Sequence, residues 1–136
     1  MNYPILTPVL AHITLVFALY LLLLQRKIAA AKKGGVDRRE AALNCKAWPE
    51  DVVKVSNNLD NQFEAPVLFY GLCLFHHVTG GVNQLALILA WTFVFSRYVH
   101  TYVHTGTNYV PHRMKAFVVG MGSLFGLFVL AVLKVV

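Results

Sequence analysis

Residues 65–96 read APVLFYGLCLFHHVTGGVNQLALILAWTFVFS, a stretch without a formally charged side chain when histidine is neutral. The adjacent glycines Gly80 and Gly81 divide it, and a glycine pair is a strong helix breaker. About 20 apolar residues are enough for a helix to cross the hydrocarbon core of a bilayer. The stretch therefore predicts two consecutive membrane-spanning helices that meet at the glycine pair.

The regions on either side repeat this pattern. Residues 1–25 and 116–133 also lack formal charges, and all six acidic residues lie between Arg26 and Glu64. Hydrophobic residues make up 57% of the 136-residue chain and charged residues only 13%, against about 25% charged in an ordinary soluble domain. We therefore expect an all-α integral membrane protein. Its single four-helix domain is expected to cover residues 1–136, with spans at about 5–28, 62–80, 83–104 and 112–134.

The second helix is expected to begin outside the membrane. Pro49 stands at a first-turn position with Glu50 and Asp51 behind it, which is a helix-start signal. No further breaker occurs before Pro66. A helix over residues 49–79 would measure about 46 Å, which is longer than the bilayer core. We therefore predict one long helix that starts in water and kinks near Pro66.

Most of the basic residues fall on one side of the predicted membrane. With four spans, the loop of residues 29–48 and the turn of residues 105–110 share that side. Positive charge collects on the cytoplasmic side of membrane proteins, so we expect a multi-pass protein whose two termini face away from the cytoplasm. The basic residues concerned are Arg26, Lys27, Lys32, Lys33, Arg38, Arg39, Lys46, Lys54, Arg113 and Lys115. They are few and mixed with acids, which argues against a nucleic-acid partner.

Two polar stripes interrupt the apolar pattern near the cytoplasmic side. The stripe on the second helix consists of Asn57, Asn61 and Glu64, at positions i, i+4 and i+7 of one face. The stripe on the third helix consists of Arg97, His100 and His104, at positions i, i+3 and i+7. A charge near mid-bilayer costs about 2.5–3.5 kcal/mol, so we predict that Glu64 and Arg97 face each other. Two roles remain open for this pair: part of a binding site, or a lock between two helices.

The histidines do not predict a metal site. His100 and His104 have chelating spacing, and His76 and His77 form a second pair. By helix rise, the second pair lies about 20 Å beyond Glu64 along its helix, near the opposite surface. The two pairs cannot meet, and we expect no bound metal.

Three segments together resemble a known family of membrane proteins. They are NNLDNQFEAPVLFY (57–70), RYVHTYVHTG (97–106) and PHRMKAF (111–117). Their order and spacing are similar to those of the MAPEG family, the membrane-associated proteins in eicosanoid and glutathione metabolism, and most similar to its bacterial members. The resemblance implies a left-handed four-helix bundle that forms a homotrimer in a bacterial inner membrane, with glutathione bound between neighbouring subunits near the cytoplasmic surface.

The resemblance also implies roles for individual residues. Asn61 and Glu64 match positions that bind the γ-glutamyl part of glutathione, and Arg97 matches an arginine that braces that helix. His100 matches a histidine that lines the site, and Arg113 matches the arginine that stabilises the glutathione thiolate. A guanidinium fixed at the first turn of a helix can favour a thiolate over a thiol, through its own charge and through the positive end of the helix.

Three positions depart from the family pattern. Asn57 stands where well-studied members have an arginine, and His104 stands where they have a tyrosine. The tyrosine or serine that the family carries close to this arginine is also missing, the residues there being Met114 and Phe117. We expect Asn57 to remain part of the binding site, and His104 to assist Arg113 as a second cation or hydrogen-bond donor.

Three functions remain open. The leading one is a glutathione-dependent transferase or peroxidase that acts on hydrophobic small molecules, electrophiles dissolved in the membrane lipid. The second is a non-catalytic protein of the same fold, whose charges serve helix pairing and assembly. The third, a small proton-coupled exporter, is disfavoured because the only membrane carboxylate, Glu64, lies on the second helix, whereas comparable exporters carry theirs on the first.

Overall fold

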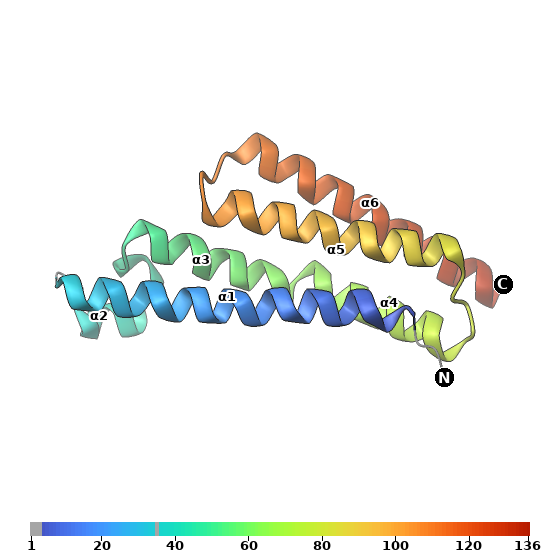
Figure 1. Ribbon diagram of the computed structural model, residues 1–136, viewed down its shortest axis with the longest axis horizontal. Coiled ribbons are helices and arrows are strands. Elements are labelled where there is room, and N and C mark those ends of the chain that lie inside the picture. Colours follow the sequence, from blue (N-terminus) through green and yellow to red (C-terminus); the bar gives the residue numbers. More distant parts are fainter. Residues whose placement is uncertain (1–3, 35) are drawn as a thin grey trace.

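A computed structural model describes residues 4–34 and 36–136 of the chain. These residues form helices and no strand, which confirms the predicted all-α class. The elements are α1 (Leu6–Lys33), α2 (Arg38–Leu43), the 3₁₀ turn η1 (Cys45–Ala47), α3 (Glu50–Asp60), the 3₁₀ turn η2 (Asn61–Phe63), α4 (Ala65–Val78), α5 (Gln84–Thr105) and α6 (Val110–Val135). Figure 1 shows α1, the α3–α4 rod, α5 and α6 packed lengthwise and running in alternating directions.

Several predicted helix ends agree with the structure. The side chain of Asn83 accepts a hydrogen bond of 2.8 Å from the N–H of Ala86 and so caps α5. Pro111 lies in the first turn of α6, where the missing N–H of proline is harmless. The first helix is longer than predicted, because alanine and lysine favour helix. It continues past residue 28 to Lys33 and ends at Gly34, which has a φ of 73°.

The second rod is not the single kinked helix that the sequence predicts. α3 ends at Asp60, η2 follows, and α4 begins at Ala65. Glu64, between η2 and α4, has φ −94° and ψ −100°, which is not a helical conformation. Pro66 explains why α3 does not continue into α4, because its ring lacks an N–H donor and would clash with the carbonyl four residues earlier in a continuous helix. In the first turn of α4 the missing N–H is tolerated.

α5 and α6 form the closest helix pair of the fold. A Cβ added to Gly120 of α6 would lie 2.5 Å from the hydroxyl oxygen of Ser96 on α5, so a larger residue would push the two helices apart. Phe69 of α4 and Phe93 of α5 are fully buried and stack with their ring centres 4.5 Å apart. This stack joins the α5–α6 pair to the second rod.

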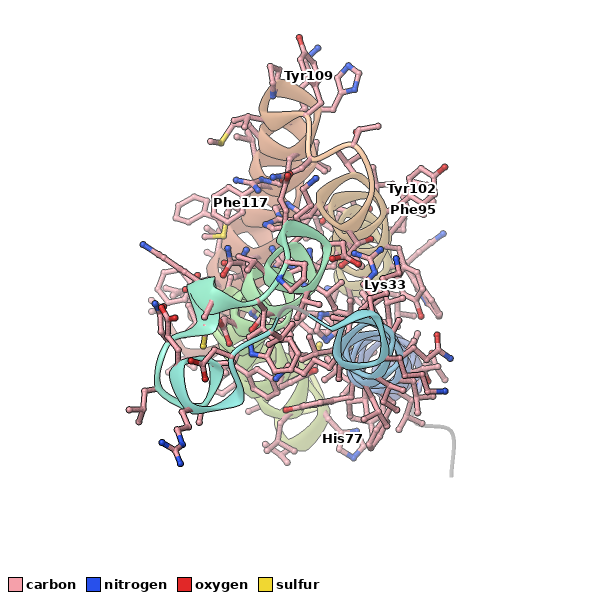
Figure 2. All side chains as sticks on the ribbon, turned by 90° about the vertical axis from the view of Figure 1, so that its left-hand side faces the viewer. Lys33, His77, Phe95, Tyr102, Tyr109 and Phe117 are labelled. Atoms are coloured by element: carbon pink, nitrogen blue, oxygen red, sulfur yellow. The ribbon has the colours of Figure 1, made fainter. Side chains whose placement is uncertain are left out.

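The outer surface suits a lipid environment. Large apolar and aromatic side chains face outward, and Phe95 and Tyr102 of α5 extend away from the neighbouring helices (Figure 2). Among the described helices, α1 and α6 are each long and apolar enough to cross a bilayer. α4 alone, at about 21 Å, is shorter than the hydrocarbon core. The segment between α1 and α3 and the turn between α5 and α6 lie at the same end of the molecule (Figure 1).

Candidate functional site

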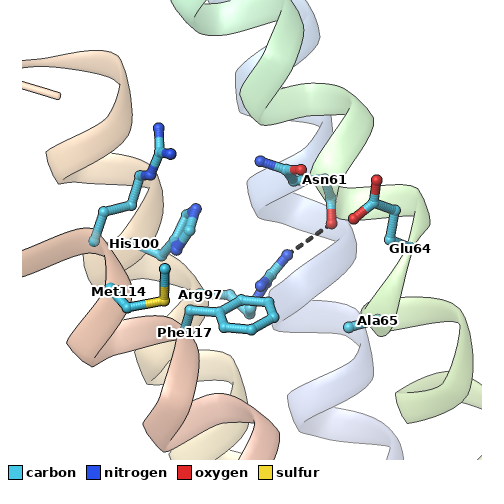
Figure 3. Close-up of a pocket in the computed structure, with 8 residues that line it drawn as sticks. Asn61, Glu64, Ala65, Arg97, His100, Met114 and Phe117 are labelled. Carbon is cyan, nitrogen blue, oxygen red and sulfur yellow. Dashed lines mark hydrogen bonds between the residues drawn. The ribbon is translucent and has the colours of Figure 1, made fainter. Parts of the chain in front are cut away.

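A pocket of about 180 Å³ opens where the break in the second rod faces the α5–α6 pair. Its lining residues are Asn61, Glu64, Ala65, Arg97, His100, Arg113, Met114 and Phe117. Figure 3 shows the labelled residues converging from the two sides of the pocket. Five of the seven residues that the sequence singled out for the site therefore meet in one cavity, although they come from segments far apart in the chain.

Arg97 is the most deeply buried charged residue of the pocket, with 3% of its surface exposed. Its Nη2 donates a hydrogen bond of 2.7 Å to the backbone carbonyl of Asn61 (Figure 3). This carbonyl is open to a side-chain donor because the helix is interrupted there. The Nε–H of Arg97 is buried and has no hydrogen-bond partner among the described residues.

Glu64 and Arg97 line the same pocket, but the predicted direct pairing between them is absent. The described part of the chain contains no ion pair between the two side chains. The non-helical backbone at Glu64 leaves its carboxylate exposed, while the guanidinium of Arg97 is held by a backbone carbonyl instead. The carboxylate of Glu64 is therefore available to a ligand.

His100 lines the pocket with both ring nitrogens unsatisfied. It is 5% exposed, and neither Nδ1 nor Nε2 forms a hydrogen bond of ordinary geometry within residues 4–34 and 36–136, although the backbone of Arg113 interacts with the ring. His104 packs beside it with the ring centres 5.6 Å apart, and the buried Nδ1 of His104 also lacks a partner in those residues. A buried polar atom without a partner costs free energy, so the group of nitrogens indicates a place for a ligand. His104 itself is not among the lining residues.

Arg113 is fixed in the first turn of α6. Its backbone N–H donates to the carbonyl of Tyr109 at 3.2 Å, and its Nη1 donates to Oδ1 of Asn108 at 2.8 Å. The guanidinium therefore lies near the positive end of the helix dipole. Together with Arg97, it gives the pocket two guanidinium groups against the single carboxylate of Glu64.

The stripe predicted on the second rod does not form one face. Asn57 is exposed and lies outside the pocket lining. The buried residues of α3 are Val52, Val55, Asn58 and Leu59. The 3₁₀ turn advances the chain by about 120° per residue instead of the 100° of an α-helix, and the chain leaves helical geometry at Glu64. Glu64 is thereby separated from the face on which Asn57 lies, whereas Asn61, whose N–H donates to the carbonyl of Asn57, stays one helical turn from it.

A second polar cluster, which the sequence reading missed, lies on the other side of η2. We call it the His12 cluster, and it consists of His12, Asn58, Gln62, Tyr70 and Thr101. Nδ1 of His12 lies 2.6 Å from the hydroxyl of Tyr70, and Nε2 of His12 lies 3.1 Å from Oε1 of Gln62. Oδ1 of Asn58 accepts hydrogen bonds from Gln62 at 3.0 Å and from Thr101 at 3.1 Å. The sequence signal for this cluster is the polar pair Asn58 and Gln62, which stands four residues apart.

The pocket has the chemistry of an anion-binding site. Guanidinium groups and buried imidazole or amide N–H groups bind carboxylates, phosphates and thiolates through charge-assisted hydrogen bonds. The described residues contain no group of three side chains placed to hold a metal ion. The carboxylate of Glu64 adds one acceptor, so the pocket suits a ligand that is mainly anionic and also carries an ammonium group.

Comparison with known proteins gives one result that covers nearly the whole chain. A sequence model of the MAPEG family matches residues 5–133. No curated protein and no solved structure matches the chain. The match includes every residue that lines the pocket. The chain therefore belongs to the MAPEG family of membrane proteins.

Proposed function

We propose that the protein is a membrane-bound, glutathione-dependent transferase or peroxidase that acts on hydrophobic electrophiles. The observation that carries the proposal is the group of buried, unpartnered nitrogens of Arg97 and His100 beside the guanidinium of Arg113. An anionic ligand would accept from the Nε–H of Arg97 and from the one ring N–H of a neutral His100. Glutathione fits this requirement, because it carries two carboxylates, one ammonium group and a thiol that ionises.

In this proposal the γ-glutamyl end of glutathione lies against the break in the second rod. Glu64 accepts the ammonium group, Asn61 binds the γ-glutamyl part, and Arg97 braces Asn61 through the hydrogen bond to its carbonyl. His100 offers a ring N–H to a ligand carbonyl or carboxylate. Asn57 extends the site by one helical turn, where its amide takes the place of a guanidinium for the more distant carboxylate.

The chemistry depends on the thiol of glutathione. Arg113 stabilises the thiolate by its charge and by its place at the start of α6. In the transferase reaction the thiolate sulfur forms a bond to the electrophilic carbon while the bond from that carbon to its leaving group breaks. The leaving group keeps the electron pair of the broken bond, and the proton lost by the thiol passes to water or to that group. In the peroxidase reaction two glutathione molecules reduce a hydroperoxide to an alcohol and water and form one disulfide. His104 assists from beside His100 as a hydrogen-bond donor.

The proposal includes a homotrimer with four spans per chain in a bacterial inner membrane and with termini on the non-cytoplasmic side. A volume of about 180 Å³ is below the range of about 300–1,000 Å³ that ligand pockets usually have. A neighbouring copy of the chain would complete the site from its open side. The hydrophobic substrate would enter from the membrane lipid, which the exposed apolar side chains of α4 and α6 contact.

Binding of glutathione by the purified protein is the direct test. In detergent micelles or lipid nanodiscs, we expect saturable binding by calorimetry and a rise in thiolate absorbance at neutral pH. Comparison of His104→Gln with wild type assigns His104, because superimposable pH–rate profiles would remove this residue from the mechanism. Absence of binding in wild-type protein would refute the proposed function.

One observation favours a second candidate, a non-catalytic membrane protein of the same fold. The pocket lining contains no hydroxyl or thiol group that could assist Arg113. In this case the charges would serve helix pairing and assembly. The protein would then form a stable oligomer that neither binds glutathione nor turns over an electrophile.

A further inference from the structure

The turn between α5 and α6 contains a residue with an uncommon backbone conformation. Asn108 has a φ of 53° and is the only non-glycine residue with positive φ in the described part of the chain. Asparagine tolerates this left-handed region better than most residues, because its short polar side chain can form local hydrogen bonds. The backbone N–H of Asn108 donates to the carbonyl of Val103 at 2.7 Å, which fastens the turn to the end of α5.

The side chain of Asn108 connects this turn to the pocket. Its Oδ1 accepts the hydrogen bond of 2.8 Å from Nη1 of Arg113. A free arginine side chain samples many rotamers, and near the end of a membrane helix it extends toward the aqueous interface. Asn108 thus ties a guanidinium on α6 to the end of the helix that carries His100, and it restricts both the height and the direction of that guanidinium.

We propose that Asn108 is a positioning residue that holds Arg113 toward the pocket in which glutathione binds. This inference rests on the proposed function for its chemical meaning. The contact itself is independent of any ligand, because it is formed within the chain alone. Only asparagine and aspartate combine an oxygen acceptor at this distance from the backbone with tolerance of the left-handed conformation.

The two properties of Asn108 can be separated by substitution. Asn108→Gly keeps the left-handed backbone without strain but removes the acceptor. Asn108→Ala removes the acceptor and also strains the turn, so it confuses the two effects. Thr107→Gly is the matched control, because it adds the same backbone freedom to the same turn and leaves the Asn108 side chain in place.

The restraint that Asn108 places on the Arg113 side chain is tested first, without ligand. An arginine-specific dicarbonyl reagent, phenylglyoxal, is reacted with the intact protein in nanodiscs, and the rate at each arginine is followed by mass spectrometry. We expect Arg113 to react several-fold faster in Asn108→Gly than in wild type or in Thr107→Gly, with the exposed Arg39 as an internal reference of unchanged rate. Equal rates at Arg113 in Asn108→Gly and wild type would overturn the inference.

The role in binding is tested with two ligands. For glutathione, we expect Asn108→Gly to raise the pKa of the bound thiol toward the value near 8.5 of a free thiol. For S-methylglutathione, which has no ionising thiol, we expect an unchanged Kd. Equal losses for both ligands would show a merely structural role and contradict the inference. A wild-type protein that binds neither ligand would refute the proposed function instead. The modification rates would still show whether Asn108 restrains the side chain of Arg113.

Discussion

Two polar regions lie on opposite sides of η2, and they differ in how completely their hydrogen bonds are formed. Gln62 turns into the His12 cluster, where its amide binds His12 and Asn58. The adjacent Asn61 lines the pocket, and its carbonyl accepts from Arg97, whose Nε–H has no partner among the described residues. Of these two consecutive residues, Gln62 belongs to a nearly complete hydrogen-bond network, and Asn61 belongs to a pocket with unpaired donors. The difference indicates that the first region stabilises the fold and that the second is shaped for a ligand.

The hydrogen positions in the His12 cluster follow from its partners. Because the Gln62 amide nitrogen donates to the Asn58 carbonyl at 3.0 Å, its Oε1 is the acceptor that faces His12. Nε2 of His12 must therefore carry the hydrogen, and Nδ1 accepts from the hydroxyl of Tyr70. In this cluster only the Nδ2 group of Asn58 is buried without a hydrogen-bond partner, counting the described residues.

The largest effect is expected from removal of a cation in the open pocket. Arg113→Leu should lower kcat/KM for glutathione conjugation by about 100-fold or more, the usual result of removing a group that stabilises a developing anion. Lys115→Leu is the matched control, since it removes an exposed cation two residues later that lies outside the pocket. Steady-state rates of both variants, with oligomer size checked by mass photometry, measure the effect. Equal losses in the two variants would mean that general charge, not Arg113, matters.

The next effect concerns the closed cluster and appears in stability. Gln62→Leu should lower the free energy of unfolding by about 1–3 kcal/mol, because it leaves the buried Nε2–H of His12 without an acceptor and removes one of the two donors to Oδ1 of Asn58. Thermal unfolding in detergent measures this loss, and glutathione affinity should change little. Asn57→Ala, an exposed position on the same rod, should stay within about 0.5 kcal/mol of wild type. A large loss of glutathione affinity with unchanged Tm in Gln62→Leu would reverse the assignment of the two regions.

A smaller effect is expected at the edge of the same cluster. Tyr70→Phe removes the donor to Nδ1 of His12 and should cost about 1 kcal/mol of stability. Tyr98→Phe is the control, because its hydroxyl also donates one hydrogen bond, to the carbonyl of Ala11 at 2.8 Å, but from an exposed side chain. The two Tm values, together with the nitrogen chemical shifts of the His12 ring, check this prediction. Equal destabilisation by the two variants would mean that the hydrogen bond between Tyr70 and His12 contributes no more to stability than the exposed one of Tyr98.

The smallest effect tests the relation between Glu64 and Arg97. Since Glu64 and Arg97 line one pocket without an ion pair between their side chains, the coupling between Glu64→Gln and Arg97→Leu should be about 1 kcal/mol or less, well below the cost of about 3–5 kcal/mol for breaking a buried pair. A double-mutant cycle of unfolding free energies measures this coupling. A coupling energy well above this limit would show that Glu64 and Arg97 pair directly and so connect the second rod to α5.

Features that depend on neighbouring residues were predictable from the sequence. The charge-free runs predicted the helical membrane class, Asn83 predicted the start of α5, and Pro111 predicted the start of α6. Each of these signals acts within a few residues, through hydrophobicity, capping or the geometry of proline. The family pattern placed Arg97, His100 and Arg113 in one site, and the structure brings these three residues into one pocket.

Only the tertiary structure decided how the polar residues are divided between the two regions. The sequence contains Asn57 and Asn58 side by side with equal chemistry, but the packing of α3 against α1 and α5 buries the second and exposes the first. The bonds from Arg97 to Asn61 and from Thr101 to Asn58 join residues on separate helices, so they depend on the angle and height at which those helices pack. Local propensity sets where a helix begins and ends, whereas contacts across the fold set which of its faces is buried.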